Sequence, residues 1–167
     1  MTARIAVLLL TMSAAAAAQS SSGYLFIGGG GISSSGEKTG TSVHAGGGAD
    51  IIVAKGLGVN GEFGALLGTI YESAGFGSFS PGVSYHFLRG KDRKVDPFFT
   101  GGYTLMFNSH RQNSLFHFGG GVTYWTSRRF GVRAEFRDQV GKASGFLNRA
   151  HGSAMHFWEI RAALAFR

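Results

Sequence analysis

The chain has 167 residues, 28 of them glycine, with 2 prolines, no cysteine and a formal net charge of +7, and its length suits a single domain. The glycines do not recur every third residue and proline is scarce, which excludes a collagen helix. The 15 phenylalanines and 5 tyrosines exclude a disordered low-complexity chain. Basic runs fall at 89–94 and 127–129, where they are typical of solvated or headgroup-facing turns. The signal for export described next argues against a nucleic-acid partner.

The first 19 residues have the pattern of a cleaved secretory signal peptide. A short basic start ending at Arg4 precedes an apolar run at 5–12 and an alanine-rich cleavage site at 14–18. The apolar run is too short to span a membrane as a helix, although an uncleaved membrane anchor is the alternative. We therefore expect residues 1–19 to be removed and residues 20–167 to form one exported domain. Without cysteine, that domain folds without disulfides in a compartment that would allow them.

The rest of the chain alternates apolar and polar residues with a period of two, which is typical of strands with two different faces. Eight such segments are predicted, at 23–33, 42–55, 57–70, 76–88, 96–107, 114–126, 129–140 and 154–166. An even number of strands, each roughly 10 to 14 residues long and joined in sequence, predicts an up-and-down barrel.

The connections between these strands alternate in length. Tight links fall at 55–56, 89–95 and 127–129, and longer polar links fall at 33–40, 71–75, 108–113 and 141–153. Outer-membrane barrels have short turns at the periplasm and longer loops outside the cell. We therefore expect both ends of the domain to lie on the short-turn side.

Each predicted strand has one face of large apolar residues and one of small or charged residues. In 129–140, Phe130 and Val132 share the first face, and Arg133 and Glu135 share the second. The second face is dominated by Gly, Ser, Thr and Ala, which are too small to fill a dry core, and its ionic groups are costly to bury without partners. The apolar face therefore points at lipid. We expect an all-β fold, an eight-stranded antiparallel up-and-down transmembrane β-barrel, with a soluble sandwich or lipocalin-like binder as the alternative.

Three stretches carry a resemblance to a known family. They read DPFFTGGY at 96–103, FHFGGGVTY at 116–124 and FGVRAEFR at 130–137. They resemble the closing strands of the OmpA/OmpX-like outer-membrane β-barrel family, in which a glycine-rich pair precedes an R-A-E-aromatic-R strand.

That resemblance implies a monomeric barrel in the cell outer membrane, surrounded by membrane lipids and lipopolysaccharide. It also implies insertion from the periplasm by the barrel-assembly machinery, which recognises an aromatic residue at the end of the last strand, here Phe166, although Arg167 follows it. No peptidoglycan-binding domain is expected, so we expect no tether to the cell wall.

Seven ionic residues fall on inward positions of the second, third, seventh and eighth predicted strands. We expect four carboxylates and three guanidiniums at similar depth to pair in the narrow lumen, because arginine suits bidentate contacts with carboxylate. The network then fills the lumen as a plug, and a network that gates a small leak of ions is the alternative. The set is Asp50, Glu62, Arg133, Glu135, Arg137, Glu159 and Arg161.

Other motifs do not indicate a cofactor or a metal. The glycine run at 28–31 and the following Lys38 do not fit a phosphate-binding loop, because the spacing has an extra residue and no helix follows. Among six histidines, His44, His86 and His117 take inward positions. The histidines lack the HxH or HxxxH spacing and the carboxylate support of a metal site.

The pair His151 and Ser153 leaves an outer-membrane lipid hydrolase as an alternative, but the Phe-x-His-x-Ser-Asn pattern of such enzymes does not occur in the sequence. We predict a small outer-membrane protein with a structural or surface-interaction role and no catalytic residues. A narrow, porin-like ion channel is the leading alternative.

Overall fold

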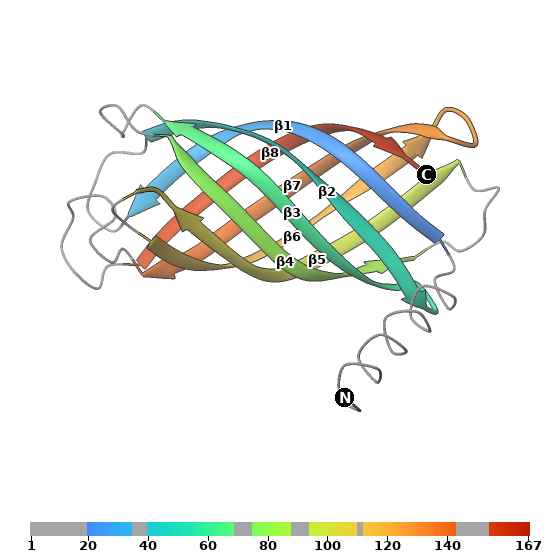
Figure 1. Cartoon of the computed structure of the whole chain (residues 1–167), viewed down its shortest axis with the longest axis horizontal. Helices are drawn as coiled ribbons and strands as arrows, with labels where there is room; N and C mark the ends of the chain where they lie inside the picture. The colour runs from blue at the N-terminus through green and yellow to red at the C-terminus, as the bar shows by residue number, and fades with distance from the viewer. Residues whose placement is uncertain (1–19, 35–39, 69–74, 88–93, 110–111, 143–153) are drawn as a thin grey trace, which may run out of the picture.

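The computed structural model describes residues 20–34, 40–68, 75–87, 94–109, 112–142 and 154–167. These residues form a closed antiparallel barrel in which each strand pairs with its neighbours in sequence and β8 closes onto β1 (Figure 1). The strands are β1 (Ser20–Ser34), β2 (Gly40–Ala54), β3 (Leu57–Gly68), β4 (Phe76–His86), β5 (Val95–Phe107), β6 (Gln112–Trp125), β7 (Phe130–Lys142) and β8 (Ala154–Phe166). The predicted fold class is confirmed. The predicted signal peptide, 1–19, lies outside the described residues.

The two ends of the barrel differ in their connections. At the turn end, on the right of Figure 1, β1 begins and β8 finishes. Lys55 and Gly56 join β2 to β3 there with φ angles of 48° and 88°, as a two-residue hairpin with two left-handed central positions requires. Ser127 supports the β6–β7 turn by accepting hydrogen bonds from the backbone N–H groups of Arg129 and Phe130. We call the opposite end, on the left of Figure 1, the loop end.

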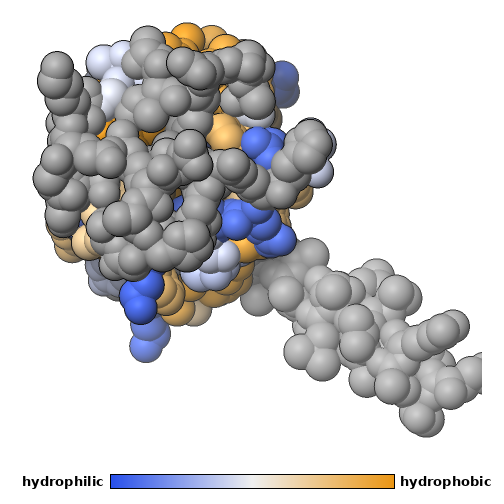
Figure 2. All heavy atoms as spheres, turned by 90° about the vertical axis from the view of Figure 1, so that its left-hand side faces the viewer, coloured by the Kyte–Doolittle hydropathy of each residue, from blue (hydrophilic) through white to orange (hydrophobic). Residues whose placement is uncertain are grey.

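The period of two in the sequence corresponds to two faces of the barrel wall, an exposed outer face and a buried inner face. In β7, Phe130 and Val132 are exposed while Arg133 and Glu135 are buried, as predicted. On the other strands, outward residues such as Phe63, Phe99 and Ile160 are exposed in the same way. Viewed onto the loop end, apolar residues are seen around the barrel wall (Figure 2). Such an apolar belt around a closed sheet is stable only against lipid, because large exposed apolar patches do not persist in water.

No helix among the described residues is long and apolar enough to cross a membrane.

The loop end of the lumen is apolar, which the sequence analysis did not anticipate. Seven side chains from six strands pack together there, each at most 4% exposed: Ile32, Leu66, Phe76, Met106, Leu115, Met155 and Phe157. A smaller apolar cluster lies at the turn end and includes Tyr24, Phe26 and Trp125. The expectation that the inward face is too small to fill a dry core is therefore wrong at the loop end, where large residues replace the Gly, Ser and Thr of mid-strand.

Candidate functional site

Between these two apolar clusters the lumen holds a network of paired charges centred on Glu62 of β3. Arg137 of β7 donates to both Glu62 oxygens at 2.5 and 2.8 Å. Arg161 of β8 donates to Oε2 at 2.9 Å, and the Tyr24 hydroxyl of β1 donates to Oε1 at 2.6 Å. A buried charge is costly unless it is paired and hydrogen-bonded. One carboxylate thus joins β3 to three strands on the other side of the barrel.

Glu135 extends the network along β7. It accepts from Arg137 Nε at 2.8 Å through one oxygen, and from Arg133 Nη2 at 3.0 Å through the other. The guanidinium of Arg133 also lies between two aromatic rings, 3.7 Å from the centroid of Phe98 and 4.4 Å from that of Tyr24. Arg133 is therefore held by both a carboxylate and cation–π contacts.

Glu159 of β8 extends the network toward the loop end and is completely buried. Its Oε1 lies 2.5 Å from Arg161 Nη2 and accepts from the Gln139 amide at 3.0 Å. Its Oε2 lies 3.0 Å from His44 Nδ1, and the other ring nitrogen of His44 lies 3.0 Å from Ser78 Oγ. Three guanidiniums and three glutamates therefore meet in one cluster with no net charge.

Asp50 lies apart from this cluster and joins a second one. Its Oδ2 lies 3.0 Å from His86 Nε2, and its Oδ1 accepts from the Ser84 hydroxyl at 2.8 Å. The Nδ1 of His86 lies 2.9 Å from Asp96 Oδ2. Both ring nitrogens of His86 thus face carboxylate oxygens, an arrangement that suits an imidazolium, which donates from both nitrogens. The turn end of the lumen thus has its own set of paired charges, built from β2, β4 and β5.

Of the seven residues predicted for the lumen network, six lie in the Glu62 cluster and Asp50 lies in the His86 cluster. The sequence analysis placed His44, His86 and His117 inside the barrel but gave them no partners. In the structure, His117 Nδ1 lies 3.0 Å from the Thr104 hydroxyl. Sequence reasoning missed Asp96, which has the same parity as the inward Thr100 and could have been found from it.

Small inward residues provide the space that these long side chains need. A Cβ atom on Gly48 would lie 2.7 Å from Glu62 Cγ and 2.9 Å from the ring of Tyr24. Side chains do not approach so closely, so glycine at this position allows the Tyr24–Glu62 hydrogen bond.

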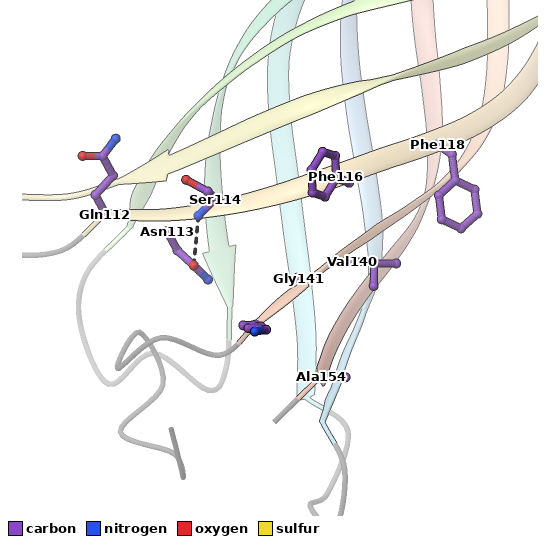
Figure 3. Close-up of a pocket in the computed structure, with 9 residues that line it drawn as sticks. Gln112, Asn113, Ser114, Phe116, Phe118, Val140, Gly141 and Ala154 are labelled. Carbon is purple, nitrogen blue, oxygen red and sulfur yellow. Dashed lines mark hydrogen bonds between the residues drawn. The ribbon is translucent and has the colours of Figure 1, made fainter. Parts of the chain in front are cut away.

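A second feature is a cleft on the outer surface between β6 and β7 at the loop end (Figure 3). Its volume is about 780 Å³. The lining residues are Gln112, Asn113, Ser114, Phe116, Phe118, Val140, Gly141, Lys142 and Ala154.

The hydrolase alternative gains one partial feature from the structure. His156 Nδ1 lies 3.1 Å from Asp138 Oδ2 on the outer face, as in the acid–histidine half of a catalytic triad. The described residues provide no serine hydroxyl hydrogen-bonded to that ring. The proposed pair His151 and Ser153 lies outside the described residues.

In the described part of the chain, no group of three His, Asp or Glu side chains could hold a metal ion.

Fold and surface together define a transmembrane β-barrel whose lumen contains a network of paired charges. Residues 4–166 match the family described as "Outer membrane protein beta-barrel domain". The chain belongs to this family, in agreement with the resemblance noted in its closing strands, and the outer membrane is its location.

Solved structures with this fold include three bacterial barrels. The N-terminal β-barrel domain of Pseudomonas aeruginosa OprF is 16% identical, with a TM-score of 0.51, and the match covers 86% of this chain and 97% of that one. Neisserial surface protein A is 17% identical, with a TM-score of 0.57 and coverage of 87% and 96%. Ail of Yersinia pestis, in complex with the heparin analogue sucrose octasulfate, is 15% identical, with a TM-score of 0.53 and coverage of 87% and 97%. These likenesses show the fold alone. No match was found among curated proteins.

Proposed function

We propose that this protein is a monomeric, non-enzymatic outer-membrane barrel with a closed lumen, which acts as a structural or surface-interaction protein. Its apolar wall contacts membrane lipids and lipopolysaccharide, and the barrel-assembly machinery inserts it. Its loop end faces the outside of the cell and carries the surfaces available for interaction. The structure of Ail with a heparin analogue is an example of a similar barrel that binds a ligand.

The observation that carries this proposal is the filling of the lumen in successive layers. Large apolar side chains, including Leu66 and Phe157, fill the loop end, and the neutral Glu62 cluster fills the middle. The void beside Tyr24, Arg133 and Arg161 is too small to hold a water molecule. An eight-stranded barrel has an interior only just wide enough for side chains to fill, so these layers leave no path for a solute.

Conductance in planar bilayers tests this proposal. We expect no steady conductance from the wild type. Opening the ionic layer alone, with Arg133→Ser and Glu135→Ser, leaves the apolar layer in place and the barrel closed. Adding Leu66→Ala and Phe157→Ala to that pair opens both layers and gives a measurable conductance.

The lipid-facing change Phe99→Ala is the matched control and leaves conductance at the wild-type level, because Phe99 is exposed on the outer wall. Heat-modifiable gel mobility verifies that each variant is folded before it is measured. A large, steady conductance from the wild type would replace this proposal with the porin-like channel.

A further inference from the structure

The seam between β6 and β7 splits before either strand ends. Their pairing stops at Leu115 and Gly141. Beyond that point Ser114 continues to pair with Leu105 of β5, and Lys142 pairs with Ala154 of β8. Each strand therefore follows its other neighbour, and the two diverge around the cleft in Figure 3.

One backbone donor at this split is satisfied by a side chain and not by a strand partner. The N–H of Ser114 donates to Asn113 Oδ1 at 2.9 Å, drawn as the dashed line in Figure 3. An unpaired strand edge inside a bilayer is costly because lipid offers no hydrogen bonds. A side chain of β6 itself accepts from this donor, so the Ser114 N–H does not need β7 as a partner.

Polarity changes along the cleft in the direction of the membrane normal. Gln112 and Lys142 lie at the loop-end rim, whereas Phe116, Phe118 and Val140 lie further into the membrane-facing wall. Phe116 is 69% exposed, so its ring is available to a ligand.

The polar rim and the apolar inner part of the cleft match the polar headgroup and the hydrocarbon chains of a lipid. A cation at the headgroup level attracts an anionic group, and the aromatic wall below it receives hydrocarbon. On the same outer face, Asp138 Oδ2 lies 3.1 Å from His156 Nδ1, so this carboxylate has a hydrogen-bonding partner of its own. The cleft volume of about 780 Å³ is within the usual range of ligand sites, roughly 300–1,000 Å³.

We propose that the β6–β7 cleft is a binding site for the lipid A part of lipopolysaccharide. One acyl chain lies against Phe116, Phe118 and Val140, and a phosphate group contacts Lys142. This assignment rests on the proposed orientation, with the loop end outside the cell, and not on whether the lumen conducts.

Native mass spectrometry of the full barrel in mild detergent tests the site, with lipid A and chemically dephosphorylated lipid A as probes. Ala154→Phe fills the cleft, and Ala162→Phe on the same strand is its control, because Ala162 faces lipid away from the cleft. Lys142→Gln removes the cation, and Lys55→Gln, in the turn at the opposite end, is its control.

One lipid A molecule per barrel is expected to survive gentle activation in the wild type and in both controls. Ala154→Phe is expected to weaken retention about tenfold, equivalent to about 1.4 kcal/mol. Lys142→Gln weakens it by roughly two- to fivefold, as an exposed ion pair allows, and dephosphorylation of the probe has the same effect on the wild type.

The proposal fails if each cleft variant loses no more lipid than its control, because the retained lipid is then bound elsewhere on the wall. It also fails if Lys142→Gln weakens retention of dephosphorylated lipid A as much as it weakens retention of intact lipid A, because the lysine then does not act through the phosphate. Gel mobility establishes that all five proteins are folded, so loss of binding is not loss of the barrel.

Discussion

Glu62 shows how a single residue ties the barrel together across its lumen. Its two oxygens accept from Arg137, Arg161 and Tyr24, which come from three different strands. A glutamine at this position would keep the shape of the side chain but would remove the negative charge that the buried guanidiniums of Arg137 and Arg161 contact. The cluster therefore acts as a unit in which each member needs the others.

The coupling inside this cluster is measurable with Arg133 and Glu135, whose side chains meet at 3.0 Å. Arg133→Met or Glu135→Gln alone leaves a buried charge with fewer partners, and each is expected to destabilise the folded barrel. The double variant should cost less than the sum, with an interaction energy of about 0.5–3 kcal/mol for residues in contact. Urea unfolding in lipid vesicles gives the three free energies of unfolding.

A control cycle pairs Arg133→Met with Asp138→Asn, which lies on the outer face and contacts His156 instead. Those two effects should add to within about 0.5 kcal/mol. If the changes in the free energy of unfolding for Arg133→Met and Glu135→Gln also add, the contact between these two side chains does not stabilise the barrel.

At the level of the strands, the outward and inward faces were predictable and the partners across the lumen were not. A period of two assigns every side chain to a face, so the sequence placed Asp50 and Glu62 inside. Which guanidinium meets which carboxylate depends on the stagger of strands around the closed barrel. That stagger brings Asp50 to His86 and Glu62 to Arg137, and nothing in the spacing of these residues along the chain encodes it.

The apolar loop end was missed for a related reason. Leu66 is followed by the outward Leu67, and Met106 is preceded by the outward Leu105, so alternation is lost where both faces are apolar. Parity with the inward Glu62 places Leu66 in the lumen, whereas polarity alone does not distinguish Leu66 from the adjacent Leu67.

The outer face of β7 offers a direct test of lipid contact. Ala134 is exposed near the middle of the strand, where a charged side chain meets hydrocarbon. Ala134→Arg is expected to destabilise the barrel in a bilayer by about 2–4 kcal/mol, while Val95→Arg, at the turn-end start of β5, should cost about 0–1 kcal/mol. Unfolding by urea in vesicles measures both, and equal costs at the two positions would contradict the membrane depth assigned to Ala134.

Across the whole molecule, the ends of the barrel give it a direction in the membrane. The start of β1, the end of β8 and the Lys55–Gly56 hairpin lie at one end (Figure 1). Short turns of outer-membrane barrels face the periplasm. The cleft between β6 and β7 lies at the other end, so this direction also places the proposed lipid site in the outer leaflet.

The chain has no cysteine, so a single introduced cysteine is the only thiol in the protein that a maleimide can label. Its labelling therefore shows which end of the barrel faces outward. Ser109 follows β5 at the loop end and is exposed, and Lys55 is exposed in the turn at the other end. A membrane-impermeant maleimide added to intact cells is expected to label Ser109→Cys and not Lys55→Cys, and both should react once the outer membrane is permeabilised. Labelling of Lys55→Cys alone in intact cells would reverse the orientation, and it would move the β6–β7 cleft to the periplasmic leaflet, away from lipopolysaccharide.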